Sequence, residues 1–196
     1  ERSRPVTQVV DEVRRLHSEG VQEVVLAGVH LGGYGSDIDS NLAGLVRAVL
    51  AGTSIPRVRL GSLEPWELPE GFWELFDDAR LMPHLHLPIQ SGADRVLRRM
   101  SRRCRSAEFR ELVAAARAHV PSFNVTTDII VGFPGETDAE WRQTITLAEE
   151  MQFGHIHIFA YSPRVGTKAA AMSDQVSRAV KRERSRQLHT ISQAGR

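Results

Sequence analysis

The chain has 196 residues, of which 41% are hydrophobic and 25% are charged. These values are typical of a globular protein long enough to bury a core, and they exclude a disordered or low-complexity chain. No run of ~18 consecutive apolar residues is present and no signal-peptide pattern opens the chain, so we expect a soluble, cytoplasmic protein without a membrane span. Cys104 is the only cysteine, which excludes an internal disulfide and fits a reducing compartment.

Charge is nearly balanced overall, with 25 basic and 24 acidic residues, but it is unevenly distributed. From Pro163 onward, eight Lys or Arg stand against two acidic residues. A second basic run lies mid-chain and consists of Arg95, Arg98, Arg99, Arg102, Arg103 and Arg105. Each run by itself is typical of a solvated helix face, whereas the two runs together also suit contact with the backbone of a nucleic acid.

Five strands are predicted, each followed by a helical pattern. The clearest lies in FNVTTDIIVGFPGET, residues 123–137, whose β-branched run is typical of a strand covered on both faces and ends at a turn rich in glycine and proline. Thr137 and Glu140 then form a capping box, which predicts the start of a helix. The other strands are predicted at residues 23–29, 57–63, 84–89 and 155–160.

Helices are predicted from apolar residues at helical spacing. The first runs from Pro5, which suits a first helical position, to Gly20. Ser106 is the predicted cap of the helix that follows the mid-chain arginines, and a basic helix is expected near residues 175–193. The remaining patterns are a helix through Leu42, Leu45, Val46, Val49 and Leu50 that ends near Gly52, and a shorter one through Phe72, Leu75 and Phe76.

Alternating strands and helices predict parallel βαβ units, arranged as a doubly wound sheet or a partial barrel. In either architecture the site lies at the carboxyl ends of the strands. We expect one domain over residues 1–170, followed by a basic C-terminal helix over residues 171–196. The predicted strand ends carry Gly28-Val29-His30, Ser62-Leu63-Glu64, Gln90-Ser91-Gly92, Asp128 with Gly132 to Glu136, and Tyr161-Ser162.

Two histidine pairs leave a metal site open as an alternative. His84 and His86 alternate on one predicted strand, and His155 and His157 on another, so the members of each pair share a face. A structural role is the better interpretation, because no further Asp or Lys pattern completes a hydrolase ligand set. Asp128 lies in an apolar strand, so it is expected to have hydrogen-bond partners or to face the rim of the sheet.

Two further side chains are weighed for catalysis. Glu64 at a strand end is more readily a hydrogen-bond acceptor for a ligand or a helix terminus than a catalytic acid. Cys104 lies among arginines that would lower the pKa of its thiol, but no partner base accompanies it. We therefore interpret Cys104 as an incidental surface thiol.

Five segments occur in a characteristic order: VLAGVHLGGYGSD, RLGSLEPWEL, HLHLPIQSGADRVLRRM, TTDIIVGFPGET and IHIFAYSPRVGTKAA. In order and spacing they resemble the radical S-adenosylmethionine methylthiotransferases over almost the whole chain. HLGGYG, SLEP, SPRVGTKAA and VKRER are most similar to the branch that methylthiolates N6-threonylcarbamoyladenosine beside the tRNA anticodon. The branches that act on isopentenyladenosine in tRNA and on a ribosomal protein are less similar in these segments.

The resemblance implies a partial (β/α)6 barrel of parallel strands with outer helices. It also implies S-adenosylmethionine as cofactor, and 4Fe-4S clusters, one of them held by a CxxxCxxC loop after the first strand. The implied partners are tRNA and a protein that donates electrons to the cluster. The sequence contains no CxxxCxxC, and residues 1–5 resemble the segment just after that loop.

We therefore expect a fragment that lacks the first strand of the barrel, the cluster ligands and the RNA-binding barrel. By itself such a fragment is expected neither to bind a cluster nor to cleave S-adenosylmethionine. The strand at 23–29 would be left as an unpaired edge, which predicts association of the isolated chain.

The resemblance further implies roles for residues at the strand ends. The backbone of Gly28, Val29 and His30 would receive the methionine amino group. The glycines are expected where a ligand approaches the backbone too closely for a Cβ. The other implied cofactor residues are Glu64, Gln90 and Ser91 at the ribose or methionine part, Asp128, Gly132, Phe133, Pro134, Gly135 and Glu136 beside the adenosyl group, and Tyr161 and Ser162 at the adenine.

Charge selects the candidate RNA contacts. They are Arg98, Arg99, Arg102, Arg103, Arg105, Lys181, Arg182, Arg184 and Arg186. Two other classes of protein stay open: a metal-dependent barrel hydrolase that uses His84 and His86, and a plain RNA-binding module that needs only the arginine clusters.

Overall fold

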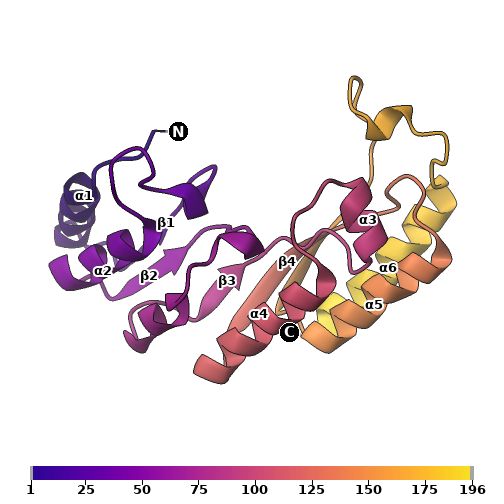
Figure 1. Ribbon diagram of the computed structural model, residues 1–196. Coiled ribbons are helices and arrows are strands. Elements are labelled where there is room, and N and C mark those ends of the chain that lie inside the picture. The colour runs from indigo at the N-terminus through magenta and orange to yellow at the C-terminus, as the bar shows by residue number, and fades with distance from the viewer. Residues whose placement is uncertain (1, 195–196) are drawn as a thin grey trace. The chain divides into compact units, whose positions relative to one another are not determined.

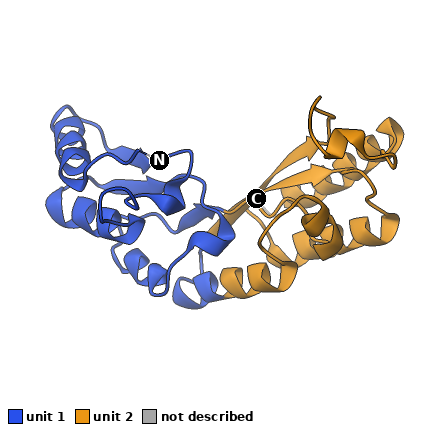
Figure 2. Ribbon diagram, turned by 45° about the horizontal axis from the view of Figure 1, so that its top comes forward, with its two compact units in different colours: residues 1–86, 115–123 blue, residues 87–114, 124–196 orange. Residues whose placement is uncertain are grey.

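The computed structural model describes residues 2–194. Glu1 and Arg196, which belong to the terminal segments discussed above, lie outside these residues. The chain divides into two compact units (Figure 2): unit 1 is Glu1–His86 with Ala115–Phe123, and unit 2 is Leu87–Ala114 with Asn124–Arg196. Each unit contains parallel strands and helices, so the α/β class expected from the sequence is confirmed.

Unit 1 contains two helices that pack on each other, α1 (Val6–Ser18) and α2 (Leu42–Gly52), beside the parallel strands β1 (Glu23–Leu26) and β2 (Arg57–Leu60) (Figure 1). Val24 pairs with Val58 in the register of the two strands, and both side chains are buried. The side chain of Asn41 caps α2 by accepting a 2.8 Å hydrogen bond from the Gly44 N–H. The other elements of this unit are η1 (Leu31–Gly33), η2 (Pro65–Glu67), η3 (Phe72–Asp77) and β3 (His84–His86).

Unit 2 is built on the parallel strands β4 (Asn124–Val131) and β5 (His155–Ala160). Two helices that lie side by side in Figure 1, α5 (Asp138–Met151) and α6 (Arg178–Ala194), belong to this unit, and α6 packs against β5. The predicted capping box at Thr137 and Glu140 is confirmed, because both of its reciprocal hydrogen bonds are present. The remaining elements are α3 (Asp94–Arg99), η4 (Ala169–Ala171) and α4 (Ser106–His119). The part of α4 up to Ala114 belongs to unit 2, and the part from Ala115 belongs to unit 1.

The apolar sequence of β4 predicts a strand that is covered on both faces, but the structure covers its two faces unequally. The side chains of Val125, Thr127, Ile129 and Val131 are buried. The alternate positions are half-buried, except Asn124 at the start of the strand, which is exposed. β4 therefore has one fully packed face and one open face, which includes Asp128.

Three predicted strands are each three residues shorter in the structure. They end at Leu26, Leu60 and His86 instead of Val29, Leu63 and Ile89. The segments beyond them make isolated hydrogen bonds and no continuous ladder. Examples are the 2.8 Å bond from the Gly61 N–H to the Leu26 carbonyl and the 2.9 Å bond from the Leu87 N–H to the Thr126 carbonyl. The alternating pattern of the sequence continues into these loops, so it does not mark the end of the ladder.

Four helix predictions need smaller corrections. Pro5 precedes α1 and is not its first residue, and Ser106 is the first residue of α4 and not its cap. The Arg105 N–H at this helix start donates instead to the Glu108 carboxylate at 2.9 Å. The pattern at residues 72–77 forms a 3₁₀-helix, and the last helix begins at Arg178 instead of near Gln175.

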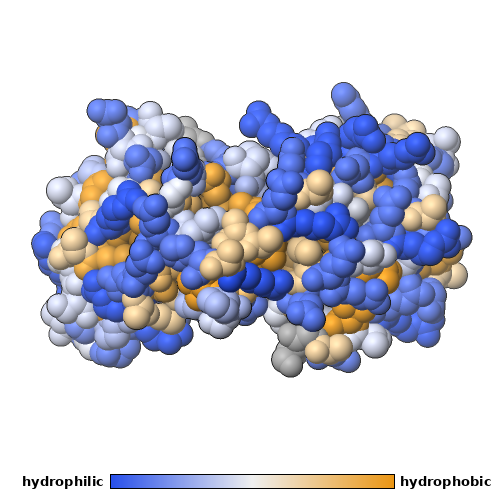
Figure 3. Space-filling view, turned by 60° about the horizontal axis from the view of Figure 1, so that its bottom comes forward, coloured by the Kyte–Doolittle hydropathy of each residue, from blue (hydrophilic) through white to orange (hydrophobic). Residues whose placement is uncertain are grey.

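Hydrophilic side chains cover much of the face drawn in Figure 3, with hydrophobic patches between them. Among the described residues, the large hydrophobic side chains that stay exposed are Val25, Val29, Phe159, Val165 and Val180. No described helix has both the length and the apolar character that crossing a bilayer requires.

Candidate cofactor-binding site

Four of the predicted cofactor residues meet at one cavity of unit 2. Gln90, Asp128, Tyr161 and Ser162 line a space of about 480 Å³. This volume is in the range of small-molecule sites, and an apolar wall with a few polar groups is their usual composition. The other lining residues are Ile130, Phe159, Ala160, Arg164, Thr167 and Ala169.

Gln90 has a left-handed backbone, with φ of 74°. Its N–H donates to the Asp128 carbonyl and its carbonyl accepts from the Ile130 N–H, both at 2.9 Å. A residue with a side chain rarely adopts this conformation, and strained positions of this kind concentrate at functional sites. The hydrogen bonds to β4 therefore hold Gln90 at the wall of the cavity.

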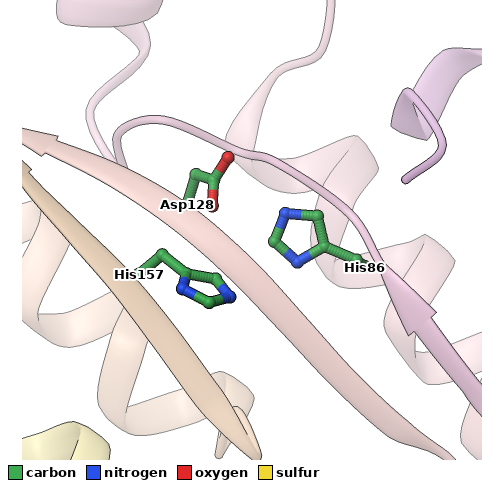
Figure 4. A group of neighbouring side chains, drawn as sticks. All are labelled: His86, Asp128 and His157. Carbon is green, nitrogen blue, oxygen red and sulfur yellow. The ribbon is translucent and has the colours of Figure 1, made fainter. Parts of the chain in front are cut away.

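The register of β4 and β5 places Asp128 opposite His157 and Ile130 opposite Phe159. Figure 4 shows Asp128 and His157 on these neighbouring strands; His86, which it also labels, is the last residue of β3 and belongs to unit 1. Asp128 lies within β4 and its side chain lines the cavity. Phe159 lines the same cavity with 52% of its surface exposed, which leaves one aromatic ring open beside a carboxylate.

Ser91 is fully buried and is not among the residues that line this cavity. Its Oγ lies 3.2 Å from Thr144 Oγ1 of α5 and accepts a hydrogen bond from the Ala93 N–H. Thr144 Oγ1 also accepts from the Gly92 N–H at 3.0 Å. These contacts join the loop after Gln90 to α5, and they leave no exposed surface on Ser91 for a ligand.

The glycine turn after β4 is shaped by the chain itself. Gly132 and Gly135 have φ of 72° and 76°, a region that favours glycine. A Cβ on Gly132 would come 2.5 Å from Cγ of Lys181, and one on Gly135 would collide with the Asp174 carboxylate. Side chains of this chain, and not a ligand, therefore occupy the space that we expected a ligand to approach.

The side chain of Glu136 is completely buried within this turn. Its Oε1 accepts hydrogen bonds from the Gly132 N–H at 2.9 Å and from Arg184 Nη1 at 2.7 Å. Burial raises the pKa of the Glu136 carboxyl, although the Arg184 guanidinium opposes this shift. Glu136 thus ties the turn to α6, and no residue from 132 to 136 lines the cavity.

Tyr161 follows β5 and joins it to β4. Its N–H donates to the Val131 carbonyl at 2.8 Å, and its ring meets the Phe133 ring edge-on at 5.3 Å. The Tyr161 hydroxyl is buried and has no hydrogen-bond partner among the described residues. Such orphaned groups are rare in folded proteins, so the hydroxyl is a candidate partner for a polar ligand.

In unit 1, Gly28, Val29 and His30 line a separate cavity of about 690 Å³. His30 Nδ1 lies 3.0 Å from Glu67 Oε1, and the Glu67 carboxylate fills the position that a Cβ of Gly32 would need. Glu64 does not line this cavity. The sequence pointed to Glu64, because it lies at a predicted strand end, and did not point to Glu67. Glu67 is the last residue of the 3₁₀-helix η2, and its carboxylate lies beside the loop after β1.

The sequence model of the radical SAM superfamily matches residues 1–148. The chain belongs to the radical SAM superfamily. It is 41% identical over 184 residues to the threonylcarbamoyladenosine tRNA methylthiotransferase MtaB of Thermotoga maritima, covering 93% of this chain and 42% of the relative. It is 40% identical over 192 residues to the tRNA-2-methylthio-N(6)-dimethylallyladenosine synthase of Staphylococcus saprophyticus, covering 96% of this chain and 37% of that relative. The chain thus spans about two fifths of the length of these relatives.

Solved structures show the same radical SAM fold. Coproporphyrinogen III oxidase (HemN) of Escherichia coli has a TM-score of 0.67 and 15% identity, with 97% of this chain and 46% of that chain covered. The methyltransferase TsrM of Kitasatospora setae, solved with cobalamin and a [4Fe-4S] cluster, has a TM-score of 0.62 and 18% identity over 80% of this chain and 31% of that chain. Membership in this superfamily agrees with the family resemblance of the sequence, and not with the metal-dependent hydrolase or the plain RNA-binding module that the sequence left open.

The cofactors of the radical SAM superfamily are S-adenosylmethionine and a 4Fe-4S cluster, and the described residues fit only the first. The unit 2 cavity offers a carboxylate, an amide, hydroxyls and an aromatic wall to an adenosyl group. A cluster needs several thiolates, whereas these residues supply one thiol, that of Cys104.

Cys104 differs from its expected character. It is buried, and burial raises the pKa of its thiol to about 11, which outweighs the lowering effect of Arg102 and Arg105. The interpretation as a surface thiol with a lowered pKa was therefore wrong. The arginines around Cys104 were visible in the sequence, but the packing that desolvates the sulfur was not.

The basic side chains of this radical SAM chain differ in their exposure to solvent and in their partners within the chain. Arg98, Arg103, Arg182 and Arg186 are exposed. Arg184 is buried against Glu136 and Asp138. Half-buried side chains that donate to other groups of the chain are Arg99 to Glu140 and the Gly135 carbonyl, Arg102 to the Pro88 carbonyl, Arg105 to the Arg102 carbonyl, and Lys181 to the Tyr161 carbonyl.

Proposed function

We propose that the intact protein containing these residues is a radical SAM tRNA methylthiotransferase that converts N6-threonylcarbamoyladenosine next to the anticodon to its 2-methylthio derivative. The observation that carries this proposal is 41% identity to the Thermotoga maritima MtaB across 93% of the chain. The segments HLGGYG, SLEP and SPRVGTKAA support the same branch of the family. The protein would act in the cytoplasm on tRNA, with an electron-donor protein as a second partner.

A second substrate has its own support. The 40% identity to tRNA-2-methylthio-N(6)-dimethylallyladenosine synthases favours a dimethylallyl-modified adenosine almost as strongly. The two substrates differ in the group on N6, which is polar and carries a carboxylate in one case and is a hydrocarbon in the other. Relatives of both kinds match this chain at nearly the same identity, so the nucleoside analysis described below includes both substrates.

In this proposal the unit 2 cavity binds the adenosyl part of S-adenosylmethionine. When bound, S-adenosylmethionine supplies the methyl and adenosyl groups of the reaction. Asp128 and Gln90 would accept and donate hydrogen bonds to its polar edge, and the backbone of Tyr161 and Ser162 would meet the adenine. The turn 132–136 would support these residues from behind, because its side chains are buried.

In unit 1 the backbone of Gly28, Val29 and His30 would receive the methionine amino group. A Cβ on Gly28 would meet only ordinary contacts, the nearest being Cα and N of Leu31 at 3.9 Å, so space beside this backbone is open to a ligand. Glu64 would act as a hydrogen-bond acceptor at the ribose or methionine part. Glu67 would hold the imidazole of His30 and thereby the loop.

The RNA contacts in this proposal are the exposed arginines Arg98, Arg103, Arg182 and Arg186. Each would pair with backbone phosphates, so affinity for tRNA should fall as salt concentration rises. The basic side chains withdrawn from this role are buried or half-buried and donate to other groups of the chain; they are Arg99, Arg102, Arg105, Lys181 and Arg184.

The 196 residues by themselves should neither bind a 4Fe-4S cluster nor cleave S-adenosylmethionine, because their single cysteine cannot provide three thiolates. Reconstitution with iron and sulfide, followed by an iron assay and detection of methionine, tests this. Stoichiometric iron together with methionine would contradict it.

The test of the main proposal is analysis of modified nucleosides. The intact, reconstituted protein is incubated with S-adenosylmethionine, a reductant, and tRNA that carries either N6-threonylcarbamoyladenosine or N6-dimethylallyladenosine. We expect the mass of a 2-methylthio product from the first tRNA only. Product from the second tRNA alone would support the dimethylallyl substrate, and product from neither would contradict the proposed function.

A further inference from the structure

We propose that Lys181 is a positioning residue that holds the ends of β4 and β5 together for the adenosyl part of S-adenosylmethionine. Charge alone selected Lys181 as an RNA contact, and the structure gives it a different task. This inference rests on the proposed use of the unit 2 cavity. It adds to that use a residue that does not line the cavity itself.

The first contact of Lys181 is with the end of β5. Its Nζ donates a 2.9 Å hydrogen bond to the carbonyl of Tyr161 and lies 5.1 Å from the centre of the Tyr161 ring. A cation at this distance from an aromatic ring is attracted to it. Because Tyr161 lines the cavity, Lys181 fixes both the carbonyl direction and the ring of a wall residue.

The second contact of Lys181 is with the turn after β4. Its Cγ and Cε occupy the space beside Gly132, where an added Cβ would lie 2.5 Å and 3.1 Å from them. Gly132 also has the positive φ that favours glycine. The methylene stem thus packs on one strand end while the amine binds the other, and the two ends are also joined by the bond from the Tyr161 N–H to the Val131 carbonyl.

This use of Lys181 conflicts with a role at an RNA phosphate. Lys181 is half-buried, and burial lowers the pKa of its amine. An amine that turned outward to a phosphate would leave the Tyr161 carbonyl and the face of the ring without their cation. Arg182, the next residue, is exposed and provides a basic side chain at the same level of α6.

α6 does not depend on Lys181 for its place in unit 2. One turn further on, Arg184 donates to the buried Glu136 at 2.7 Å, and Leu188 is fully buried. A Lys181→Met substitution keeps a flexible apolar stem beside Gly132 and removes only the charge and the donor. We therefore expect this variant to fold, so that its effect on the cofactor can be measured.

The experiment compares Lys181→Met, Lys181→Arg and Arg182→Met in the intact, reconstituted protein. Calorimetry gives the affinity for S-adenosylmethionine, and a salt titration gives the slope of tRNA binding. Lys181→Met should weaken S-adenosylmethionine binding on the order of tenfold, as expected for the loss of a charge-assisted hydrogen bond, and leave the salt slope unchanged. Lys181→Arg, which keeps a donor and a charge, should recover part of the affinity.

Arg182→Met should show the opposite pattern, with unchanged S-adenosylmethionine affinity and a shallower salt slope. The inference is overturned if Lys181→Met binds S-adenosylmethionine as the unmodified protein does, or if it reduces the salt slope. Hydrogen exchange at the Tyr161 and Gly132 amides gives a readout that does not need the cofactor. Faster exchange in Lys181→Met supports the positioning role, and unchanged exchange contradicts it. Failure of the unmodified protein to bind S-adenosylmethionine would instead contradict the proposed function.

Discussion

Arg184 donates a 2.7 Å hydrogen bond to the carboxylate of Glu136, and both side chains are withdrawn from solvent. Arg184 comes from α6 and Glu136 from the turn after β4, 48 positions apart in the chain. The same guanidinium donates to the exposed Asp138 at 2.8 Å. An arginine in the basic C-terminal helix therefore acts within the fold and not on its surface.

Arg184→Met should lower the free energy of unfolding by about 3–5 kcal/mol, because it leaves the Glu136 carboxylate buried without its cation. Arg186→Met is the matched control, since Arg186 pairs with Glu183 in an exposed ion pair and should change stability by less than about 1 kcal/mol. Urea unfolding of both variants measures the difference. Equal losses for the two arginines would contradict the buried pair.

The loss in Arg184→Met should depend on pH. Burial raises the pKa of Glu136 in the folded protein, and removal of Arg184 takes away a cation that lowers it, so the pKa rises further in the variant. A raised folded pKa means that the contribution of Glu136 to stability is complete below its ordinary value of 4.5 and is lost as pH rises through the folded value. The deficit of the variant should therefore grow from pH 5 to pH 7.5. A deficit that shrinks over this interval would refute the assignment.

Cys104 should react slowly with iodoacetamide while the protein is folded. Burial raises the pKa of its thiol to about 11, so little thiolate is present at pH 8, and the sulfur is also shielded. Unfolding in urea should restore the reactivity of an ordinary thiol. Mass spectrometry of the alkylated protein follows both rates, and rapid labelling of the folded protein would show that the sulfur is accessible.

Glu67→Ala should weaken binding of S-adenosylmethionine by the intact protein, because it frees the His30 imidazole and the loop after β1 from the 3.0 Å contact with Glu67. Glu67→Gln keeps an acceptor for His30 and should retain most of the affinity. Glu70→Ala, three residues on in an exposed position, is the control and should have no effect. Loss of affinity in the glutamine variant equal to that in the alanine variant would show that the negative charge matters and not the hydrogen bond.

Gly92→Ala should destabilise the protein by about 1–3 kcal/mol through overpacking. An added Cβ would lie 2.6 Å from Cα of Thr144 and 2.8 Å from the Gln143 carbonyl oxygen, and backbone atoms of α5 cannot move aside cheaply. Gly44→Ala in α2 is the matched control, because its Cβ would meet only ordinary contacts and alanine favours a helix by about 1 kcal/mol at most. Thermal unfolding should shift in opposite directions for the two variants.

Much of the fold could be predicted because the relevant signals are local. The capping box at Thr137 and the run of apolar residues in β4 are short-range patterns, and both predicted elements are present. The ends of β1, β2 and β3 were each placed three residues too late, since the last hydrogen bond of a ladder depends on the neighbouring strand. The sequence of one strand does not contain that information.

The candidate site also contains residues that could be predicted from the sequence and residues whose surroundings could not. Strand ends predicted that Gln90, Asp128, Tyr161 and Ser162 would lie near one another, and they share a cavity. The sequence could not distinguish these residues from Ser91 and Glu136, which do not line the cavity and contact α5 and α6 instead. Those partners are more than 45 residues away in the chain, so only the folded arrangement shows which polar groups are already satisfied.

The left-handed backbone of Gln90 restricts how this pocket can be redesigned. Glycine, asparagine and aspartate adopt positive φ readily, whereas β-branched residues do so at high energetic cost. A library that randomises position 90 together with Asp128 should therefore lose its valine, isoleucine and threonine members during selection for folded protein. Diversity aimed at new ligands would be better spent at Phe159 or Arg164, which share the same wall and lie outside the left-handed region.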